Sequence, residues 1–260
     1  MRKRSTLIVG MAMALVAALA ASVAVAGAPV TGADGNSQAI DVKIGPKKLS
    51  KTQFTPATLE VTTKVTNATT KGNVPFPATR VVVDFAKPVK LFTKGLPTCT
   101  AGKLQNVSTD VAKQNCKGAI IGSGKAAALL PVGETIFPVN QVVTAFNGVP
   151  KGGKPTVLLH TYGTTPIQTT LVLNGVVSNY NKQGYGPRLD VEVPLIAGGA
   201  GALTDFNVKI NKKWKYKGNS VSFISAKCPN NKKLKARGAF TFLDGETITA
   251  LSNQSCQQKK

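Results

Sequence analysis

Apolar and polar residues alternate with a period of two along much of this chain. In Leu189-Asp-Val-Glu-Val193 the apolar side chains fall on one face of an extended strand and the two carboxylates on the other. Similar runs rich in Val, Ile, Thr and Phe are bounded by Gly, Pro and Asn, which is typical of β-strands. The predicted strands are residues 57–66, 79–86, 118–130, 134–146, 155–162, 168–178, 188–195, 203–210, 213–217, 220–227, 236–243 and 246–251.

These strands predict an all-β fold, which we interpret as an antiparallel β-sandwich of about ten to twelve strands. Asp244-Gly245 is a hairpin signal between two such runs, and Lys217-Gly218-Asn219 is placed to join two others. We expect a flexible leader over residues 29–45 and a single domain over residues 46–258. Two smaller sandwiches divided near residue 150 are the alternative, although no change of composition marks a linker there.

One segment departs from the strand pattern and predicts a short helix. Leu104, Val107 and Val111 recur at helical spacing, and Ser108 or Thr109 is placed to cap a helical turn. We therefore expect a short helical insert on the sandwich, held by a disulfide across it. A structural role for the insert is one reading, and recognition by a protruding loop is the other.

The N-terminal residues have the composition of a secretory signal. Three basic residues, Arg2 to Arg4, precede an apolar run from Leu7 to Ala26 that ends in small residues. We predict a cleaved signal peptide over residues 1–28 and hence an exported protein. An uncleaved membrane anchor is the alternative, because the apolar run has about the length that spans a bilayer. In either case the membrane is a partner only through this segment.

The four cysteines are predicted to form two disulfides, because an exported chain folds in an oxidising environment. Sequence separation favours Cys99 with Cys116 and Cys228 with Cys256, which is one of three possible connectivities. Zinc binding is the alternative. However, no C-x2-C pair occurs and His160 is the only histidine, so we expect no metal and no cofactor.

The charge balance is strongly basic, with 33 Lys and Arg against 11 Asp and Glu. Removal of Arg2, Lys3 and Arg4 lowers the formal net charge from +22 to about +19. Such a charge implies attraction to polyanions, which outside a cell are anionic envelope polymers, acidic polysaccharides or phospholipid headgroups rather than a specific nucleic acid. The alternative is that the lysines keep strand edges from pairing with other molecules.

The segment from Val208 to Lys217 shows how the lysines are distributed. Trp214 and Tyr216 fall on one face of the predicted strand together with the aliphatic residues, so we interpret them as packing residues rather than as platforms for stacked bases. The lysines fall on the opposite face. The candidate polyanion-binding residues are Lys209, Lys213, Lys215 and Lys217, with Lys47, Lys48, Lys232, Lys233 and Lys235 as secondary contributors.

No catalytic motif is complete in this sequence. Gly148-Val-Pro-Lys-Gly-Gly-Lys154 matches the start of a phosphate-binding loop, but Pro155 stands where Ser or Thr is needed and a strand follows instead of a helix. We interpret the segment as a turn. His160 lies in a predicted strand with no nucleophile elbow in the chain, so we expect a half-buried strand histidine. The aspartates in predicted loops are well separated in sequence and predict no calcium site: Asp34, Asp41, Asp205 and Asp244.

Asp190 and Glu192 are the one pair of carboxylates with a spacing suited to catalysis. Two apart on one strand, they point to the same face at roughly 7 Å, which is compatible with glycoside hydrolysis. A sugar site would also need a concave groove lined by an aromatic residue such as Tyr185 or Trp214. Because so few acids occur on a basic surface, we expect these carboxylates to pair with a lysine or with Arg188 instead.

Several segments resemble a group of exported actinobacterial-type proteins of unknown function. They are Leu96-Pro-Thr-Cys99 followed by Cys116, Gly122-Ser-Gly124, Leu158-Leu-His-Thr-Tyr-Gly163, Gly184-Tyr-Gly-Pro-Arg188 and Ile224-Ser-Ala-Lys-Cys228. The resemblance covers most of the chain after the predicted signal peptide. It implies export, a β-rich fold and the use of disulfides, and it carries no activity and no functional residue.

The sequence therefore predicts an exported, non-catalytic β-sandwich protein that associates electrostatically with anionic polymers of the cell envelope or its surroundings. A carbohydrate-active enzyme or sugar-binding module is the first alternative. A purely structural or adhesive module is the second, for which exposed apolar patches would be the sign.

Overall fold

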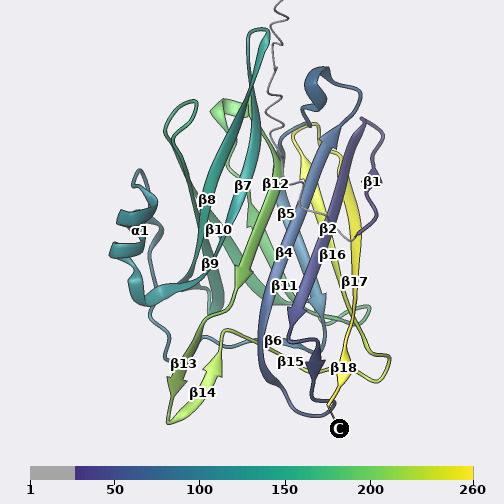
Figure 1. Cartoon of the computed structure of the whole chain (residues 1–260), viewed down its shortest axis with the longest axis vertical. Coiled ribbons are helices and arrows are strands. Elements are labelled where there is room, and N and C mark those ends of the chain that lie inside the picture. The colour runs from purple at the N-terminus through teal and green to yellow at the C-terminus, as the bar shows by residue number, and fades with distance from the viewer. Residues whose placement is uncertain (1–26, 260) are drawn as a thin grey trace, which may run out of the picture.

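The computed structural model describes residues 27–259, and nearly all regular structure within them is β-strand (Figure 1). The strands are β1 (Val30–Thr31), β2 (Asn36–Gly45), β3 (Lys48–Leu49), β4 (Thr55–Asn67), β5 (Ala78–Ala86), β6 (Val89–Leu91), β7 (Ile120–Val132), β8 (Thr135–Lys151), β9 (Lys154–Gly163), β10 (Thr169–Asn179), β11 (Tyr185–Glu192), β12 (Ala202–Ile210), β13 (Lys213–Tyr216), β14 (Asn219–Ser222), β15 (Ile224–Ala226), β16 (Lys233–Phe242), β17 (Thr247–Ser255) and β18 (Gln257–Gln258). The helices are α1 (Thr109–Asn115) and the 3-10 turns η1 (Lys71–Asn73), η2 (Ala101–Lys103), η3 (Lys117–Ala119) and η4 (Ala197–Gly199).

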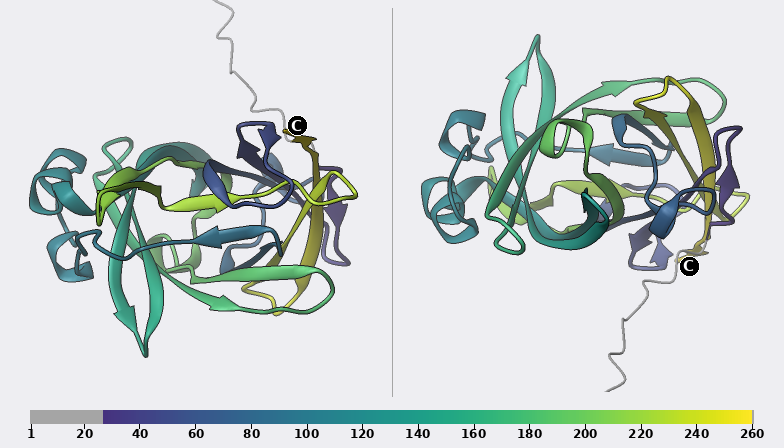
Figure 2. Two further views of the ribbon diagram at one scale, coloured as in Figure 1. Left: turned by 90° about the horizontal axis from the view of Figure 1, so that it is seen from below. Right: turned by 90° about the horizontal axis from the view of Figure 1, so that it is seen from above.

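The main sheet is antiparallel and forms a nearly closed barrel, so the predicted all-β class is confirmed but the predicted sandwich is wrong. Its strands follow the order β1-β2-β4-β12-β7-β8-β9-β10-β11-β5-β16-β17. The last strand packs against β2, near the first, and the views along the long axis show the strands arranged around one interior (Figure 2). A sandwich and a barrel both need one apolar face per strand, so alternation alone does not distinguish them.

Side chains of β17 close the seam between β17 and β2. The Gln254 side chain accepts a hydrogen bond from the Ile44 backbone N–H at 2.6 Å and donates one to the Ile44 carbonyl at 2.8 Å. The Ser252 hydroxyl accepts a hydrogen bond from the Val42 backbone N–H at 2.9 Å. These contacts satisfy backbone groups of β2 that no neighbouring strand reaches, which removes an open sheet edge.

The expected flexible leader over residues 29–45 is not what the structure shows. Residues 36–45 form β2, which pairs along its whole length with β4 and contributes Ile40, Val42 and Ile44 to the core. The alternation of these three residues with polar neighbours carried the strand signal. The strand is stable because β4 pairs with it along its length and because β17, about two hundred residues further along the chain, packs against it.

The insert between β6 and β7 contains the predicted short helix and disulfide, but Leu104 and Val107 lie before α1 and Val111 is exposed rather than packed. Cys99 and Cys116 form a disulfide across a sequence separation of 17, and the Ser108 hydroxyl caps α1 by accepting from the Val111 backbone N–H at 3.4 Å. Leu104 and Ala112 are buried beneath the insert against strands β8 and β9. The insert therefore packs as a small satellite core on the outside of the barrel.

The second predicted disulfide, Cys228–Cys256, is also confirmed. It ties the connection between β15 and β16 to the last strands of the chain, and both cysteines are buried. The two predicted hairpin turns are present as well, since β16 pairs with β17 around Asp244-Gly245 and β13 pairs with β14 around Lys217-Gly218.

Two further sequence-based predictions concern the membrane and export. The predicted signal peptide lies outside the described residues, except for Gly27 and Ala28. Among residues 27–259, no helix has the length and apolar character that crossing a membrane requires.

Candidate functional site

The two ends of the barrel carry opposite charge. Because neighbouring strands are antiparallel, successive turns alternate between the ends, and β3, β6, β13, β14, β15 and β18 gather at the lower end of Figure 1. We call this the basic end, meaning the described residues 46–54, 87–99, 151–154, 180–184, 211–233 and 256–259. These segments contain no Asp or Glu. Their lysines are Lys47, Lys48, Lys51, Lys87, Lys90, Lys94, Lys151, Lys154, Lys182, Lys212, Lys213, Lys215, Lys217, Lys227, Lys232, Lys233 and Lys259.

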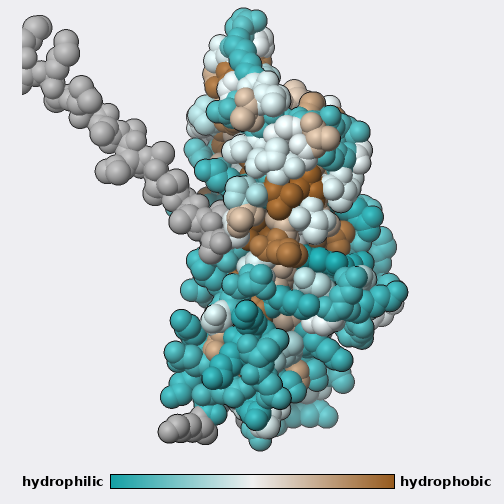
Figure 3. All heavy atoms as spheres, turned by 90° about the vertical axis from the view of Figure 1, so that its right-hand side faces the viewer, coloured by the Kyte–Doolittle hydropathy of each residue, from teal (hydrophilic) through white to brown (hydrophobic). Residues whose placement is uncertain are grey.

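The turns at the opposite end contain acidic residues and apolar tips. Asp34, Glu134, Asp244 and Glu246 lie there, and the one lysine in these turns, Lys71, forms an ion pair with Glu134. Exposed apolar side chains also occupy these turns or their edges: Phe76, Val132, Ile167, Leu195 and Leu243. Seen from one side, the lower half of the surface is almost uniformly hydrophilic, whereas apolar patches appear in the upper half (Figure 3).

The structure brings most of the candidate polyanion-binding lysines to the same end. Lys47, Lys48, Lys213, Lys215, Lys217, Lys232 and Lys233 lie within the basic end and are exposed, and Lys209 is exposed near the end of β12. Lys235 differs, because its ammonium group donates to the Gln183 carbonyl at 2.6 Å and lies over the Tyr185 ring. Among the described residues, no ion pair involves a lysine of the basic end. Their charges therefore add to one positive field.

The aromatic residues of the β13–β14 hairpin pack on the face opposite its lysines, as predicted. The Trp214 ring stacks on Phe92 with centroids 5.8 Å apart, and Tyr216 meets the same ring edge-on at 5.5 Å. The Trp214 indole N–H donates to the Lys94 carbonyl at 3.1 Å. These contacts hold the hairpin against the barrel and leave its exposed lysines facing solvent.

A buried aspartate with two arginines lies on the outer face of β5, β11 and β16, and sequence reasoning missed it. Asp84 is only 1% exposed and accepts from Arg188 at 2.6 and 3.0 Å and from Arg237 at 2.7 Å. Both guanidinium groups lie over the Tyr180 ring. Burial alone would raise the pKa of Asp84, but hydrogen bonds and attraction from the two arginines hold it below its ordinary value.

The candidate catalytic carboxylates point outward, as predicted, but Arg188 is not their partner. Arg80 donates to both oxygens of Asp190, and its hydrogen bonds lower the pKa of Asp190. A general acid in a glycosidase needs a raised pKa instead. Asp190 and Glu192 do line an outer groove of about 740 Å³, but neither Tyr185 nor Trp214 belongs to its lining. Asp190 is therefore engaged in an ion pair with Arg80, and the groove lacks, among the described residues, the aromatic lining expected of a sugar site.

His160 is fully buried beneath the helical insert rather than half-buried as predicted. Its Nε2 lies 3.0 Å from the Val107 carbonyl, and its Nδ1 has no hydrogen-bond partner among the described residues. On the neighbouring strands it pairs with Thr144 and Val172, so no charged group stands directly beside it on either strand. Burial lowers the pKa of His160 below 6.5, and the contact with Val107 offsets this only in part.

This buried histidine predicts a loss of stability in weak acid. The unfolded chain binds a proton at His160 more readily than the folded chain, so the free energy of unfolding should fall as pH drops below about 6.5, by up to about 1.4 kcal/mol per pH unit. The measurement is urea unfolding of the wild type and of His160→Gln between pH 7.5 and 5. The difference in the free energy of unfolding between the wild type and His160→Gln should become smaller toward low pH. A difference that stays constant with pH would contradict the prediction.

Three acidic side chains from distant parts of the sequence meet at the end opposite the basic end. Asp34 from the β1–β2 turn lies with Asp244 and Glu246 from the β16–β17 turn, with carboxylate oxygens within 4.8 Å of one another. Glu246 also accepts from the Ala33 backbone N–H at 2.5 Å. The two turns are more than two hundred residues apart, which is why sequence spacing did not reveal the cluster.

No protein-family model matches the chain, and no curated protein or solved structure is significantly similar to it. The chemistry that the structure itself provides is therefore the basis for a function. The two disulfides indicate an oxidising, extracytoplasmic environment.

Proposed function

We propose that this protein is exported and associates electrostatically with anionic polymers of the cell envelope or its surroundings through the basic end. The observation that carries the proposal is the segregation of charge. Lysines without acidic neighbours occupy the turns at one end, whereas Asp34, Glu134, Asp244 and Glu246 occupy the other. Lysines that served only to protect strand edges would have no reason to gather at one end of a nearly closed barrel.

The physical basis is a multivalent field rather than a pocket. Exposed lysines on flexible stems attract a polyanion without fixing its orientation, and each contributes about 1 kcal/mol or less to such an association. Dissolved salt screens these contacts over about 10 Å at 0.1 M ionic strength. Binding should therefore be strong at low salt, indifferent to the detailed structure of the polymer and steeply weakened by added salt.

The test compares two variants with the same loss of charge. In one, Lys213, Lys215, Lys217 and Lys232 of the basic end become Gln. In the other, four exposed lysines away from that end become Gln: Lys64, Lys103, Lys113 and Lys125. The protein used begins at residue 27. Its binding to three materials, polygalacturonate, dextran and washed envelope, is measured at 50 to 300 mM salt.

We expect the wild type to bind polygalacturonate and envelope, but not dextran, with affinity falling steeply as salt rises. At low salt the basic-end variant should bind about 10- to 100-fold more weakly than the wild type, and the matched variant within about threefold. Equal losses in the two variants would contradict a role for the basic end. Salt-resistant binding to dextran would instead favour a sugar-binding site.

A further inference from the structure

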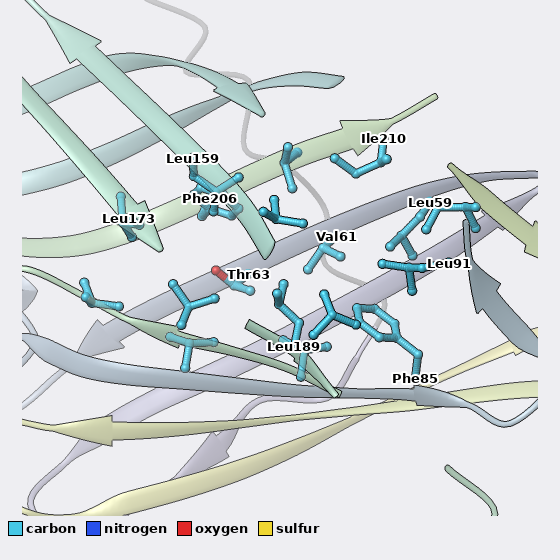
Figure 4. Close-up of a pocket in the computed structure, with 18 of the residues that line it drawn as sticks. Leu59, Val61, Thr63, Phe85, Leu91, Leu159, Leu173, Leu189, Phe206 and Ile210 are labelled. Carbon is cyan, nitrogen blue, oxygen red and sulfur yellow. The ribbon is translucent and has the colours of Figure 1, made fainter. Parts of the chain in front are cut away.

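The interior of the barrel contains an apolar cavity of about 110 Å³. Its walls come from β4, β5, β9, β10, β11 and β12, and β6, β15, β16 and the residue Phe223, between β14 and β15, complete them. Figure 4 shows side chains such as Leu59, Val61, Leu173 and Phe206 converging on this space. Within the described part of the chain, Thr63 is the one lining residue that carries a side-chain oxygen.

The cavity is a departure from normal packing. Protein interiors are packed as densely as organic crystals, and a void deprives its lining atoms of contacts. Leu173, Leu189 and Phe206 point into the barrel and yet are only partly buried. Apolar cavities of about 150 Å³ remain dry and take up small apolar molecules. The cavity here has room for a short alkyl segment, and the Thr63 hydroxyl is the one side-chain oxygen among its described lining residues.

A basic groove adjoins this cavity at the lower end of the barrel. It has a volume of about 800 Å³, and three exposed lysines line it, Lys87, Lys90 and Lys154. Leu91 and Val177 line both the groove and the cavity, so they form the boundary between the two spaces. Among residues 27–259, no acidic side chain lines the groove.

We propose that the barrel binds a single-chain anionic amphiphile of the fatty-acid class. The end of the alkyl chain enters the cavity past Leu91 and Val177, and the carboxylate remains in the groove among Lys87, Lys90 and Lys154. The apolar interior favours the alkyl chain, and burial of a charge there is unfavourable. The lysines favour an anionic headgroup over a neutral or cationic one. This function is separate from polymer binding and does not depend on it.

The first experiment measures how affinity depends on chain length, with hexanoate, octanoate, decanoate and 1-octanol as probes. Calorimetry should give one binding site per protein molecule. The affinity should rise about fourfold for each methylene added to the ligand until the cavity is filled. Methyl resonances of Val61, Leu173 and Leu189 should shift on binding of octanoate. Weak binding to many sites, or saturation without these shifts, would overturn the proposal.

The second experiment separates chain from headgroup. Val61→Phe and Leu189→Phe each place extra volume in the cavity, and each should lower the affinity for octanoate at least tenfold. Two such variants are made so that the test still stands if one of them does not fold. Changing Lys87, Lys90 and Lys154 to Gln should lower the affinity for octanoate about 10-fold. The affinity for 1-octanol should stay within twofold of that of the wild type. The matched control changes Lys64, Lys103 and Lys125 to Gln. It should bind octanoate and 1-octanol with the affinities of the wild type.

Each outcome decides the proposal. Undiminished octanoate binding in a folded cavity variant would overturn it, as would equal losses for octanoate and 1-octanol in the groove variant. Because 1-octanol carries no charge, its binding tests the cavity even if the basic end does not bind polymers. Conversely, the groove lysines are not those changed in the polymer test, so either function can fail alone.

Discussion

Replacing Asp84 with Asn is expected to lower the free energy of unfolding by about 3 to 5 kcal/mol. The carboxylate is almost completely buried and is the acceptor for both Arg188 and Arg237. Asn keeps the shape of the side chain but leaves two guanidinium groups beside a neutral amide. Their charge would then be only partly hydrated, because the two arginine side chains are 28% and 23% exposed. Urea unfolding followed by circular dichroism measures the effect.

The matched control for Asp84 is Asp190→Asn on the neighbouring strand. Asp190 also pairs with an arginine, but Arg80 is 55% exposed, so that loss should be about 1 kcal/mol or less. If Asp84→Asn lowers the free energy of unfolding no more than Asp190→Asn does, the stabilising role of the buried Asp84 carboxylate is contradicted. Because the arginines lower the pKa of Asp84, its contribution should be present above about pH 4 and lost as pH falls through the folded-state pKa.

Removing the Cys228–Cys256 disulfide is expected to lower the free energy of unfolding by about 3 to 4 kcal/mol. This bond closes a loop with a sequence separation of 28 that contains all of β16 and β17. Without the bond the unfolded chain gains conformational entropy, and the segment that is released contains the strands that form the seam with β2. The measurement compares urea unfolding of Cys228→Ala/Cys256→Ala with that of the wild type.

The Cys99–Cys116 pair provides the contrast, because it closes only the external insert. Its replacement by alanines should raise amide hydrogen exchange in residues 100–115 while the strands of the barrel keep their protection. If this second pair proves to protect the barrel strands as much as Cys228–Cys256 does, the insert is part of the barrel's cooperative unit. In that case the description of it as a satellite core is wrong.

Local features of the structure were predictable from the sequence because they depend on neighbours along the chain. The alternation in Leu189-Asp-Val-Glu-Val193 places the two carboxylates outside and the aliphatic residues inside, as observed. The cap at Ser108 and the turn at Asp244-Gly245 are set by short-range hydrogen bonds and backbone preferences. Sequence separation also favoured the two disulfides that form.

Other predictions failed because they concern contacts between strands, which no local pattern along the chain reveals. Residues 36–45 carried a strand pattern, but only pairing with β4 and contact with β17 make them a buried strand. Arg188 was proposed as the partner of Asp190 or Glu192, whereas the register of β5, β11 and β16 places it beside Asp84. No local signal identifies Asp84 as buried, since in sequence it is a polar residue at an outward position of a strand.

By itself the sequence determined most of the strands, their inward and outward faces and the excess of lysine, and it favoured the cysteine pairing that forms, because these follow from composition and from spacing along the chain. Only the tertiary structure decided that the sheet curls into a nearly closed barrel rather than a sandwich. It also decided that the turns free of acids meet at one end and that the interior is left with an apolar cavity. The reason is that strand order, register and seam depend on hydrogen bonds between segments up to about two hundred residues apart, which no local pattern specifies.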